Sequence, residues 1–248
     1  MSEPHQAHLE ALEKLCRMLA RIYAVEEPPA VTPFLVDEDG LQALASCGAI
    51  TPRTGAREEV FVLDDGHEVS LAVYLDERAR QAVSDCVRDD GLALSTEQFG
   101  DFCVALEGVS HFLLMSHRAQ AEQPVTELEL ELQAEVDKYV VARLSPWVHA
   151  ITLTAEGEEP RASVSLVDAR AAPDPGELQR VLFQSYALAE HLRTEQVERY
   201  VTASRLAQRY CRRLERDYLH SRRHSRALAD LCAFYRKSQV GRLHHIGW

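Results

Sequence analysis

The sequence predicts a mainly α-helical protein of the α+β class, a multi-helix, bundle-like fold with one or two small antiparallel β-hairpins. Three observations predict it. Long segments place apolar residues at three- and four-residue steps, the spacing of one helical face. Two capping boxes mark positions where helices begin. One Asp-Gly pair, at residues 65 and 66, lies between two runs of β-branched and apolar residues, which is a strong hairpin signal.

The N-terminal part is expected to contain a helix, a hairpin and a second helix. Residues 7–24 place their apolar side chains at helical spacing, and two consecutive prolines follow this segment. In the hairpin, a two-residue Asp-Gly turn would place Val62 opposite Val69. Residues 77–90 have the pattern of a helix that ends near an Asp-Asp-Gly run.

Two long helices are predicted in the middle of the chain. A Ser-x-x-Gln run at residue 95 and a Thr-x-x-Glu run at residue 126 both have the form of a capping box. No proline interrupts the pattern between them until Pro124. Because the link is short, the two helices, at about 95–121 and 126–144, should pack antiparallel.

The C-terminal part is expected to be helical after a second small hairpin. The segments 147–155 and 162–167 alternate loosely, which predicts two antiparallel strands. Helical spacing then begins near Pro175 and continues almost to the C-terminus, with breaks near Arg193 and Ser221.

Charge divides the chain into an acidic part and a basic part, although the net charge of the 248 residues is −12. From Arg205 to the end there are eleven basic and three acidic residues, a balance of +8. The remainder has 16 basic and 36 acidic residues, a balance of −20. We therefore expect an acidic mixed α/β body at residues 1–170 and a basic helical region at 171–248 that packs on it.

Composition predicts a soluble protein of a reducing compartment, because 46% of the residues are hydrophobic and 27% charged. The N-terminal segment has no basic stretch followed by an apolar one, so no secretory signal is expected. No apolar run approaches the length of a membrane span. The six cysteines are scattered without close spacing, which favours free thiols. We expect a cytoplasmic protein that does not associate with membranes.

Glu107 and His111 form a candidate site, because they stand one turn apart in a predicted helix that is otherwise apolar almost all round. Buried charge is costly unless it is paired. The next helix carries a row of like charges at Glu127, Glu131 and Glu135, and antiparallel packing brings the last two level with His111. A histidine among carboxylates can hold a divalent metal or move a proton. The candidate metal ligands are Glu107, His111, Glu131 and Glu135.

A structural interpretation of the same residues stands beside the metal hypothesis, and the sequence favours it. Di-iron helix bundles use Glu-x-x-His twice, whereas this chain has Glu-x-x-x-His once. The glutamate row also has the form of a solvated face that Lys138 and Arg143 could neutralise. Glu107 and His111 would then be a polar pair that finds its partners inside the core.

The basic region presents a continuous row of arginines on one predicted helix. Four of them, Arg205, Arg209, Arg212 and Arg216, follow at steps of three or four residues, so their side chains share one face, and Arg213 lies beside it. The opposite face of the helix carries apolar residues such as Val201, Cys211 and Leu214. We name this set the arginine face, and its members are Arg205, Arg209, Arg212, Arg213 and Arg216.

Three partners suit the arginine face: nucleic acid, an acidic protein surface, or the acidic body of the chain itself. The acidic body would repel phosphates beyond the local patch, and no helix-turn-helix, zinc-finger or RNA-binding signature is present. An acidic protein partner is therefore favoured over nucleic acid, and a homo-oligomer is compatible with the pattern.

Motifs of common enzyme classes are absent from the sequence. It contains no GxGxxG, GxxxxGK[ST], HExxH or GxSxG run. The leading functional hypothesis is therefore a non-enzymatic adaptor or regulator that binds a macromolecular partner through the arginine face. The alternative is a metal-dependent enzyme or metal sensor that uses the glutamates and histidine between the two central helices.

Overall fold

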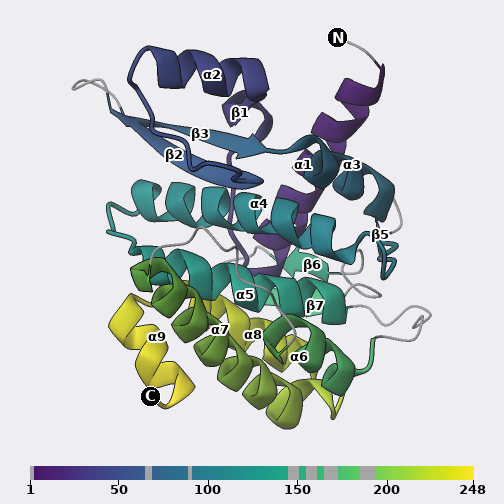
Figure 1. The fold of residues 1–248 in the computed structure, drawn as a ribbon. Coiled ribbons are helices and arrows are strands. Elements are labelled where there is room, and N and C mark those ends of the chain that lie inside the picture. Colours follow the sequence, from purple (N-terminus) through teal and green to yellow (C-terminus); the bar gives the residue numbers. More distant parts are fainter. Residues whose placement is uncertain are drawn as a thin grey trace.

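Two long antiparallel helices lie at the centre of the molecule (Figure 1). In the computed structural model, α4 (Phe99–Gln120) packs against α5 (Glu127–Leu144). The described residues are 3–64, 69–88, 91–144, 151–154, 161–164, 173–184 and 194–248, and most of them are helical. The small sheets and the dominant helices confirm the predicted α+β class.

The capping boxes have different outcomes in the two central helices. At α5 the box is complete, because the Thr126 amide donates to the Glu129 carboxylate (3.0 Å) and the Glu129 amide donates to the Thr126 hydroxyl (3.2 Å). At α4 the amide of Gln98 donates to the Ser95 hydroxyl (3.3 Å), but the helix begins only at Phe99. The predicted start at residue 95 is therefore a turn that leads into the helix.

A three-stranded sheet covers one side of α4, and its order is β1-β3-β2. It consists of β1 (Leu35–Val36), β2 (Glu58–Asp64) and β3 (Val69–Leu75). The predicted hairpin is present, but its register was predicted wrongly, because Val62 pairs with Leu71 and not with Val69. The shift is two residues, so every side chain keeps its predicted face. The Asp-Gly turn itself lies outside the described residues.

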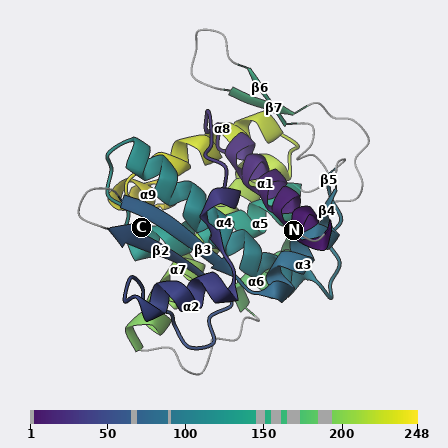
Figure 2. The ribbon, with the colours of Figure 1, turned by 90° about the horizontal axis from the view of Figure 1, so that it is seen from above.

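The sheet lies between α2 (Glu38–Ser46) and α4 (Figures 1 and 2). Phe61 and Tyr74 pack toward α2 in a small separate cluster. Val73 and Leu75, on the other face, join the main core with the residues of α4. The strands alternate between two apolar layers, so both faces of the sheet are covered.

Helices α1 (Glu3–Ile22) and α3 (Glu77–Cys86) pack beside α4 and complete this end of the core. The prediction for α3 was wrong at its end, because the helix stops at Cys86 and the chain turns into a short strand pair. The remaining short elements here are η1 (Thr32–Phe34), β4 (Val87–Arg88) and β5 (Gly91–Leu92).

The C-terminal helices pack on α5 from the side opposite α4 (Figure 1). Helix α7 makes the main contact with α5 and continues into a π-helical turn, η3. The predicted second hairpin and the predicted helical segments are confirmed. The elements are β6 (Ile151–Thr154), β7 (Arg161–Val164), α6 (Pro175–Gln184), α7 (Thr194–Leu214), η3 (Glu215–Leu219), α8 (His224–Tyr235) and α9 (Gln239–Ile246).

By length and composition, α4 could cross a membrane, which the sequence pattern did not lead us to expect. In the fold it lies between the sheet and α5, and the side chains of Phe102, Leu106 and Phe112 are at most 1% exposed. This is the position of a core helix, in which an apolar surface is covered by other elements of the chain.

Candidate metal site

Three potential metal ligands meet where α4 faces α5. The ligating atoms of Glu107, His111 and Glu131 all lie within 4.8 Å of one another. We call these three residues the Glu/His cluster. The first two residues stand one turn apart on α4, and the third stands on the facing turn of α5. The antiparallel pairing predicted from the sequence therefore brings three of the four candidate ligands together.

Glu58, at the start of β2, completes the surroundings of His111, and it was not a candidate in the sequence. Its Oε1 atom lies 3.3 Å from Nδ1 of His111. Gly108 makes this approach possible, because a Cβ atom at that position would lie 2.9 Å from Cγ of Glu58 and 2.8 Å from Cδ2 of Leu75. The sequence signal for a close approach was Gly108 itself, but nothing local indicated which segment approaches.

The two ring nitrogens of His111 have different environments. Nδ1 is engaged by Glu58, whereas Nε2 is buried without a hydrogen-bond partner among the described residues and lies 4.0 Å from Oε2 of Glu131. The side chain of His111 is only 10% exposed. Metal-bound histidines commonly have this arrangement, with one ring nitrogen held by a carboxylate and the other directed at the metal.

Neighbouring carboxylates hold a proton on His111. Burial alone would lower the pKa of His111, but the hydrogen bond with Glu58 and the charges of Glu58 and Glu131 outweigh it and raise the pKa to about 9. Burial raises the pKa of Glu131, with Glu107 and Glu58 adding to the effect and His111 opposing it. A proton and a metal ion are therefore alternative cations for this site, and binding of the metal must release the proton.

Basic side chains neutralise part of the acidic charge around the cluster. Lys138 on α5 donates to Glu107 (2.6 Å) and to Glu135 (2.7 Å). Burial would raise the pKa of Glu107, but the charges of Lys138 and His111 lower it. On the other side, Nε of Arg199 on α7 lies 3.8 Å from Glu131. The structure thus places Glu135 with Lys138, outside the Glu/His cluster.

The cluster has the chemistry of a transition-metal site. Imidazole and carboxylate ligands suit Zn²⁺, Fe²⁺, Co²⁺ and Mn²⁺, and ligand distances to zinc are about 2.0–2.2 Å. Two ligands of one tetrahedral zinc ion are then roughly 3.3–3.6 Å apart. Nε2 of His111 and Oε2 of Glu131, at 4.0 Å, need to approach by only a few tenths of an ångström.

A second buried polar group lies farther along the same helix pair. Asp137 is 1% exposed and accepts hydrogen bonds from the Tyr23 hydroxyl and from the Gln133 amide (2.8 Å). Burial raises the pKa of Asp137 to about 6, against the opposing effect of its hydrogen bonds from Tyr23 and Gln133. These contacts satisfy Asp137 within the core, so its role is structural.

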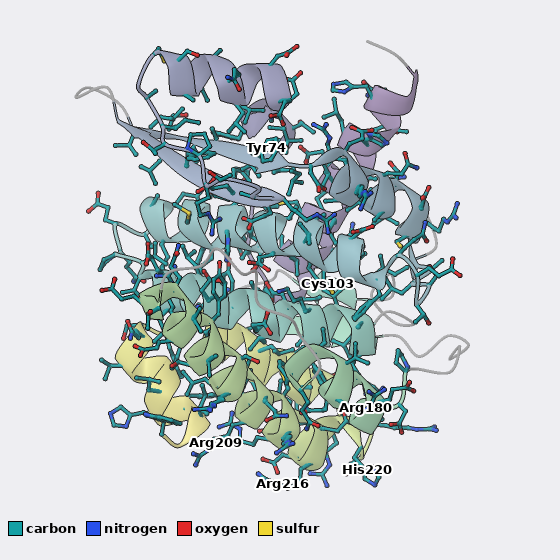
Figure 3. All side chains as sticks on the ribbon, in the orientation of Figure 1. Tyr74, Cys103, Arg180, Arg209, Arg216 and His220 are labelled. Carbon is teal, nitrogen blue, oxygen red and sulfur yellow. The ribbon has the colours of Figure 1, made fainter. Side chains whose placement is uncertain are left out.

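The arginine face lies on α7 and η3 as the spacing indicated, with four of its members exposed and Arg213 half-buried. Figure 3 shows Arg209 and Arg216 on the outer surface, at the end of the molecule away from the sheet. The apolar side of α7, including Cys211 and Leu214, is buried.

The members of the arginine face differ in their partners. Arg213 binds Asp230 (2.9 Å) and the backbone carbonyl of His245, and Arg209 donates to the carbonyl of Gly247 (2.6 Å). Arg216 pairs with the adjacent Asp217 (2.7 Å). In the part of the chain that the structure describes, Arg205 and Arg212 form no hydrogen bond or ion pair. Arg143, which the sequence offered as a partner of the glutamate row, pairs with Glu215 (2.9 Å).

No protein-family model, curated protein or solved structure matches this chain.

Proposed function

We propose that the protein is a regulatory metal-binding protein that holds one divalent transition-metal ion in the Glu/His cluster. The observation that carries the proposal is the buried Nε2 of His111, which has no hydrogen-bond partner among the residues that the structure describes and lies near two carboxylates. An unsatisfied buried polar atom is costly, and a bound cation would satisfy it. Glu58, on Nδ1, would orient the ring and fix its tautomer.

The burial of the cluster favours a regulatory ion over a catalytic one. The side chains of His111 and Glu131 are 10% and 9% exposed, and that of Glu107 is 17% exposed. A catalytic metal keeps an open position for substrate or water, which requires access that these side chains do not have. The ligands come from α4 and α5, and Arg199 links Glu131 to α7, so that occupancy of the site would bias how these three helices pack.

Calorimetric titration of the chelator-treated protein with Zn²⁺ tests this function. We expect one ion per chain with a Kd in the micromolar range or below. This Kd corresponds to a binding free energy of about −8 kcal/mol or more negative. His111→Gln and Glu131→Gln should each weaken binding at least tenfold, because each removes a ligand without changing the side-chain volume greatly.

His245→Gln is the matched control for the titration. It removes a histidine of the C-terminal helix, which pairs with Asp230 and lies outside the cluster. Zinc affinity should be unchanged in this variant. Unaltered binding in both cluster variants, or loss of binding only in His245→Gln, would contradict the proposal and would assign His111 to a structural polar pair.

Binding of an acidic protein partner through the arginine face is a second candidate function. The specific observation in its favour is that the guanidinium groups of Arg205 and Arg212 are exposed and without partners among the described residues. Such groups can form bidentate hydrogen bonds with carboxylates of another protein. Arg209, Arg213 and Arg216 already have contacts within the chain, so the proposed interface consists of Arg205 and Arg212.

Charge reversal tests the second candidate. In a pull-down from the source cells, Arg205→Glu with Arg212→Glu should reduce partner capture, and more strongly at low salt, where screening is weakest. A control with the same charge change at Arg17 and Arg78, exposed residues of α1 and α3, should capture the partner normally. Equal capture by all three proteins would contradict this interface.

A further inference from the structure

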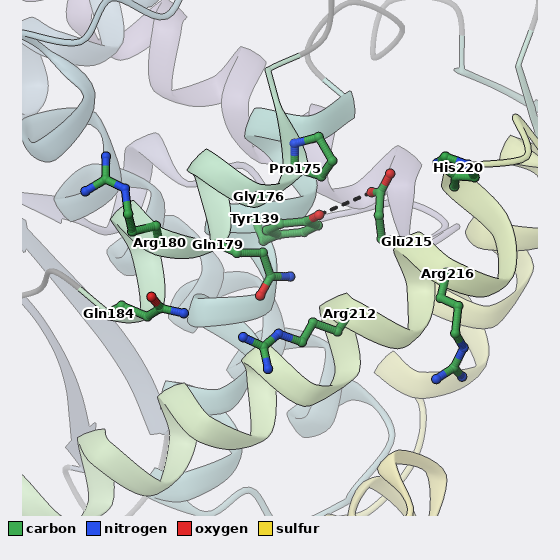
Figure 4. Close-up of a pocket in the computed structure, with 10 residues that line it drawn as sticks. All are labelled: Tyr139, Pro175, Gly176, Gln179, Arg180, Gln184, Arg212, Glu215, Arg216 and His220. Atoms are coloured by element: carbon green, nitrogen blue, oxygen red, sulfur yellow. Dashed lines mark hydrogen bonds between the residues drawn. The ribbon is translucent and has the colours of Figure 1, made fainter.

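A cavity of about 650 Å³ lies between α6, α7 and η3, with Tyr139 of α5 at its base (Figure 4). Pockets for small ligands commonly have volumes of about 300–1,000 Å³. The Glu/His cluster contributes no residue to this cavity. Its lining is Tyr139, Pro175, Gly176, Gln179, Arg180, Gln184, Arg212, Glu215, Arg216 and His220.

The charge of the lining is positive. Arg180, Arg212 and Arg216 are exposed around the cavity, and His220 lies at one end of it. Glu215 is the one acidic residue among the ten, and it is already engaged by Arg143 (2.9 and 3.1 Å) and by the Tyr139 hydroxyl (3.2 Å). Arg180 lies 4.0 Å from Glu177 and Arg216 pairs with Asp217 (2.7 Å), so Arg212 is the cation that the cavity offers to a ligand.

Arg212 is the central cation of the cavity. Figure 4 shows its guanidinium group directed toward Gln179 and Gln184, whereas the guanidinium of Arg216 points away from them. Arg216 also pairs with Asp217 (2.7 Å), while Arg212 has no carboxylate partner among the described residues. A guanidinium group binds the oxygens of a phosphate in a bidentate fashion.

Gln179 provides a second, independent sign of a ligand. Its side chain is buried, with 7% of the residue exposed, and its Oε1 atom has no hydrogen-bond partner within the described part of the chain. An unsatisfied buried acceptor beside a cavity suits a ligand whose hydroxyl or amino donor reaches it. Half-buried Pro175 and exposed Gly176 supply apolar surface at the cavity, and Tyr139 lies beneath them, fully buried.

The backbone at the edge of the cavity is also unusual. Residues Glu215–Leu219 form a π-helical turn, in which the amide of His220 donates to the carbonyl of Glu215 (2.9 Å). Such turns are rare, and they occur frequently at functional sites because they redirect side chains from the regular helical face. Here the turn carries Arg216 and Asp217, and His220 follows it directly.

We propose that this cavity binds a small organic phosphate, with Arg212 on the phosphate group, Pro175 against the organic body, and Gln179 accepting a hydrogen bond from it. Arg180 and Arg216 add positive charge at the edges of the cavity. The ligand is a low-molecular-weight effector or substrate of phosphate-ester class, and its site is separate from the metal site.

Titration with phenyl phosphate, followed by calorimetry, tests the proposal on the full chain. One molecule should bind with a Kd below about 1 mM. Inorganic phosphate, which lacks the organic body, and benzyl alcohol, which lacks the charge, should bind at least tenfold more weakly. Arg212→Gln should weaken phenyl phosphate binding at least tenfold, and Gln179→Leu should weaken binding of an aryl phosphate that carries a hydroxyl donor.

Arg205→Gln is the matched control, because Arg205 is an exposed arginine of the same helix that does not line the cavity. Its affinity for phenyl phosphate should equal that of the wild type. Equal weakening by Arg205→Gln and Arg212→Gln would indicate general electrostatic attraction and overturn the proposal. Absence of phenyl phosphate binding would also overturn it, and benzoate binding as tight as phenyl phosphate binding would overturn the assignment to phosphates.

Discussion

At the scale of single residues, the two ring nitrogens of His111 explain why the Glu/His cluster could bind a metal ion. One nitrogen is held by a carboxylate of the sheet and the other is left facing carboxylates of the helices. A proton competes with a metal ion for this arrangement at neutral pH, since the pKa of His111 is raised to about 9 by its carboxylate neighbours in spite of its burial. Asp137 shows the opposite case, in which burial raises the pKa of a carboxyl although Tyr23 and Gln133 donate to its Oδ1 atom.

Asp137 predicts a pH dependence of stability. Its pKa rises from 3.8 to about 6 on folding, so between these pH values the native state holds a proton that the unfolded state has lost. Stability from this group therefore falls as the pH rises from about 4 to about 6. In Asp137→Asn this loss is absent. The difference in unfolding free energy, variant minus wild type, should therefore be up to roughly 3 kcal/mol more positive above pH 6 than at pH 3.

Urea unfolding of both proteins at pH 4 and pH 7 measures this effect. The side-chain oxygen of an asparagine can still accept from Tyr23 and Gln133, so the comparison isolates the charge. A difference in unfolding free energy that is the same at both pH values would contradict the assignment.

At the scale of elements, α4 is the helix that assembles the site, because it contacts both the sheet and α5. Its neighbour α5 was predictable from a capping box that the structure contains, and the antiparallel pair placed His111 beside Glu131 in advance. Glu58 was not predictable. Its approach depends on a contact between residues 53 positions apart and on the packing of a strand over a glycine, neither of which leaves a local sequence pattern.

The register of the hairpin and the end of α3 were also not predictable from local sequence patterns. Periodicity indicates which face a side chain takes, and this was correct for Val62 and Leu71. The length of the connection between strands, and the early end of a helix at Cys86, depend on tertiary contacts that override local preference. The pairing of Arg143 with Glu215 is likewise a contact between distant helices.

Gly108→Ala tests the role of the close approach. The added Cβ would lie within 3 Å of side-chain atoms of Glu58 and Leu75, so these side chains must move, and we expect a loss of about 1–3 kcal/mol in unfolding free energy. Gly100→Ala, in the first turn of the same helix, meets no atom within 4 Å and should leave stability unchanged or raise it by up to about 1 kcal/mol. Thermal and urea unfolding compare the two. Equal effects of both substitutions would show that Gly108 does not set the packing distance.

At the scale of the whole molecule, the acidic and basic parts of the chain meet along α5 and α7. The basic region uses part of its charge internally. Arg213 joins α7 to α8 and α9 through Asp230 and the carbonyl of His245, and Arg242 is fully buried, where it donates to three backbone carbonyls. The charge asymmetry was visible in the sequence, but the division into internal and free arginines depends on where the last two helices pack.

This division predicts unequal effects within the arginine face. Arg213→Gln should lower the unfolding free energy by roughly 2 kcal/mol, because it removes charged hydrogen bonds that hold α8 and α9. Arg205→Gln should change it by no more than about 0.5 kcal/mol, as expected for an exposed residue without partners. Urea unfolding distinguishes them, and comparable losses in both variants would mean that Arg205 also has a structural contact.

The most direct test of the proposed metal site is to locate the ion. Crystals of the zinc-loaded protein, measured on both sides of the zinc absorption edge, give an anomalous difference map that shows each zinc ion independently of the protein atoms. We predict one strong peak between Nε2 of His111 and the carboxylates of Glu107 and Glu131, about 2 Å from its ligands. A map with no peak at that position, or with zinc only at surface histidines such as His244 and His245, would contradict it.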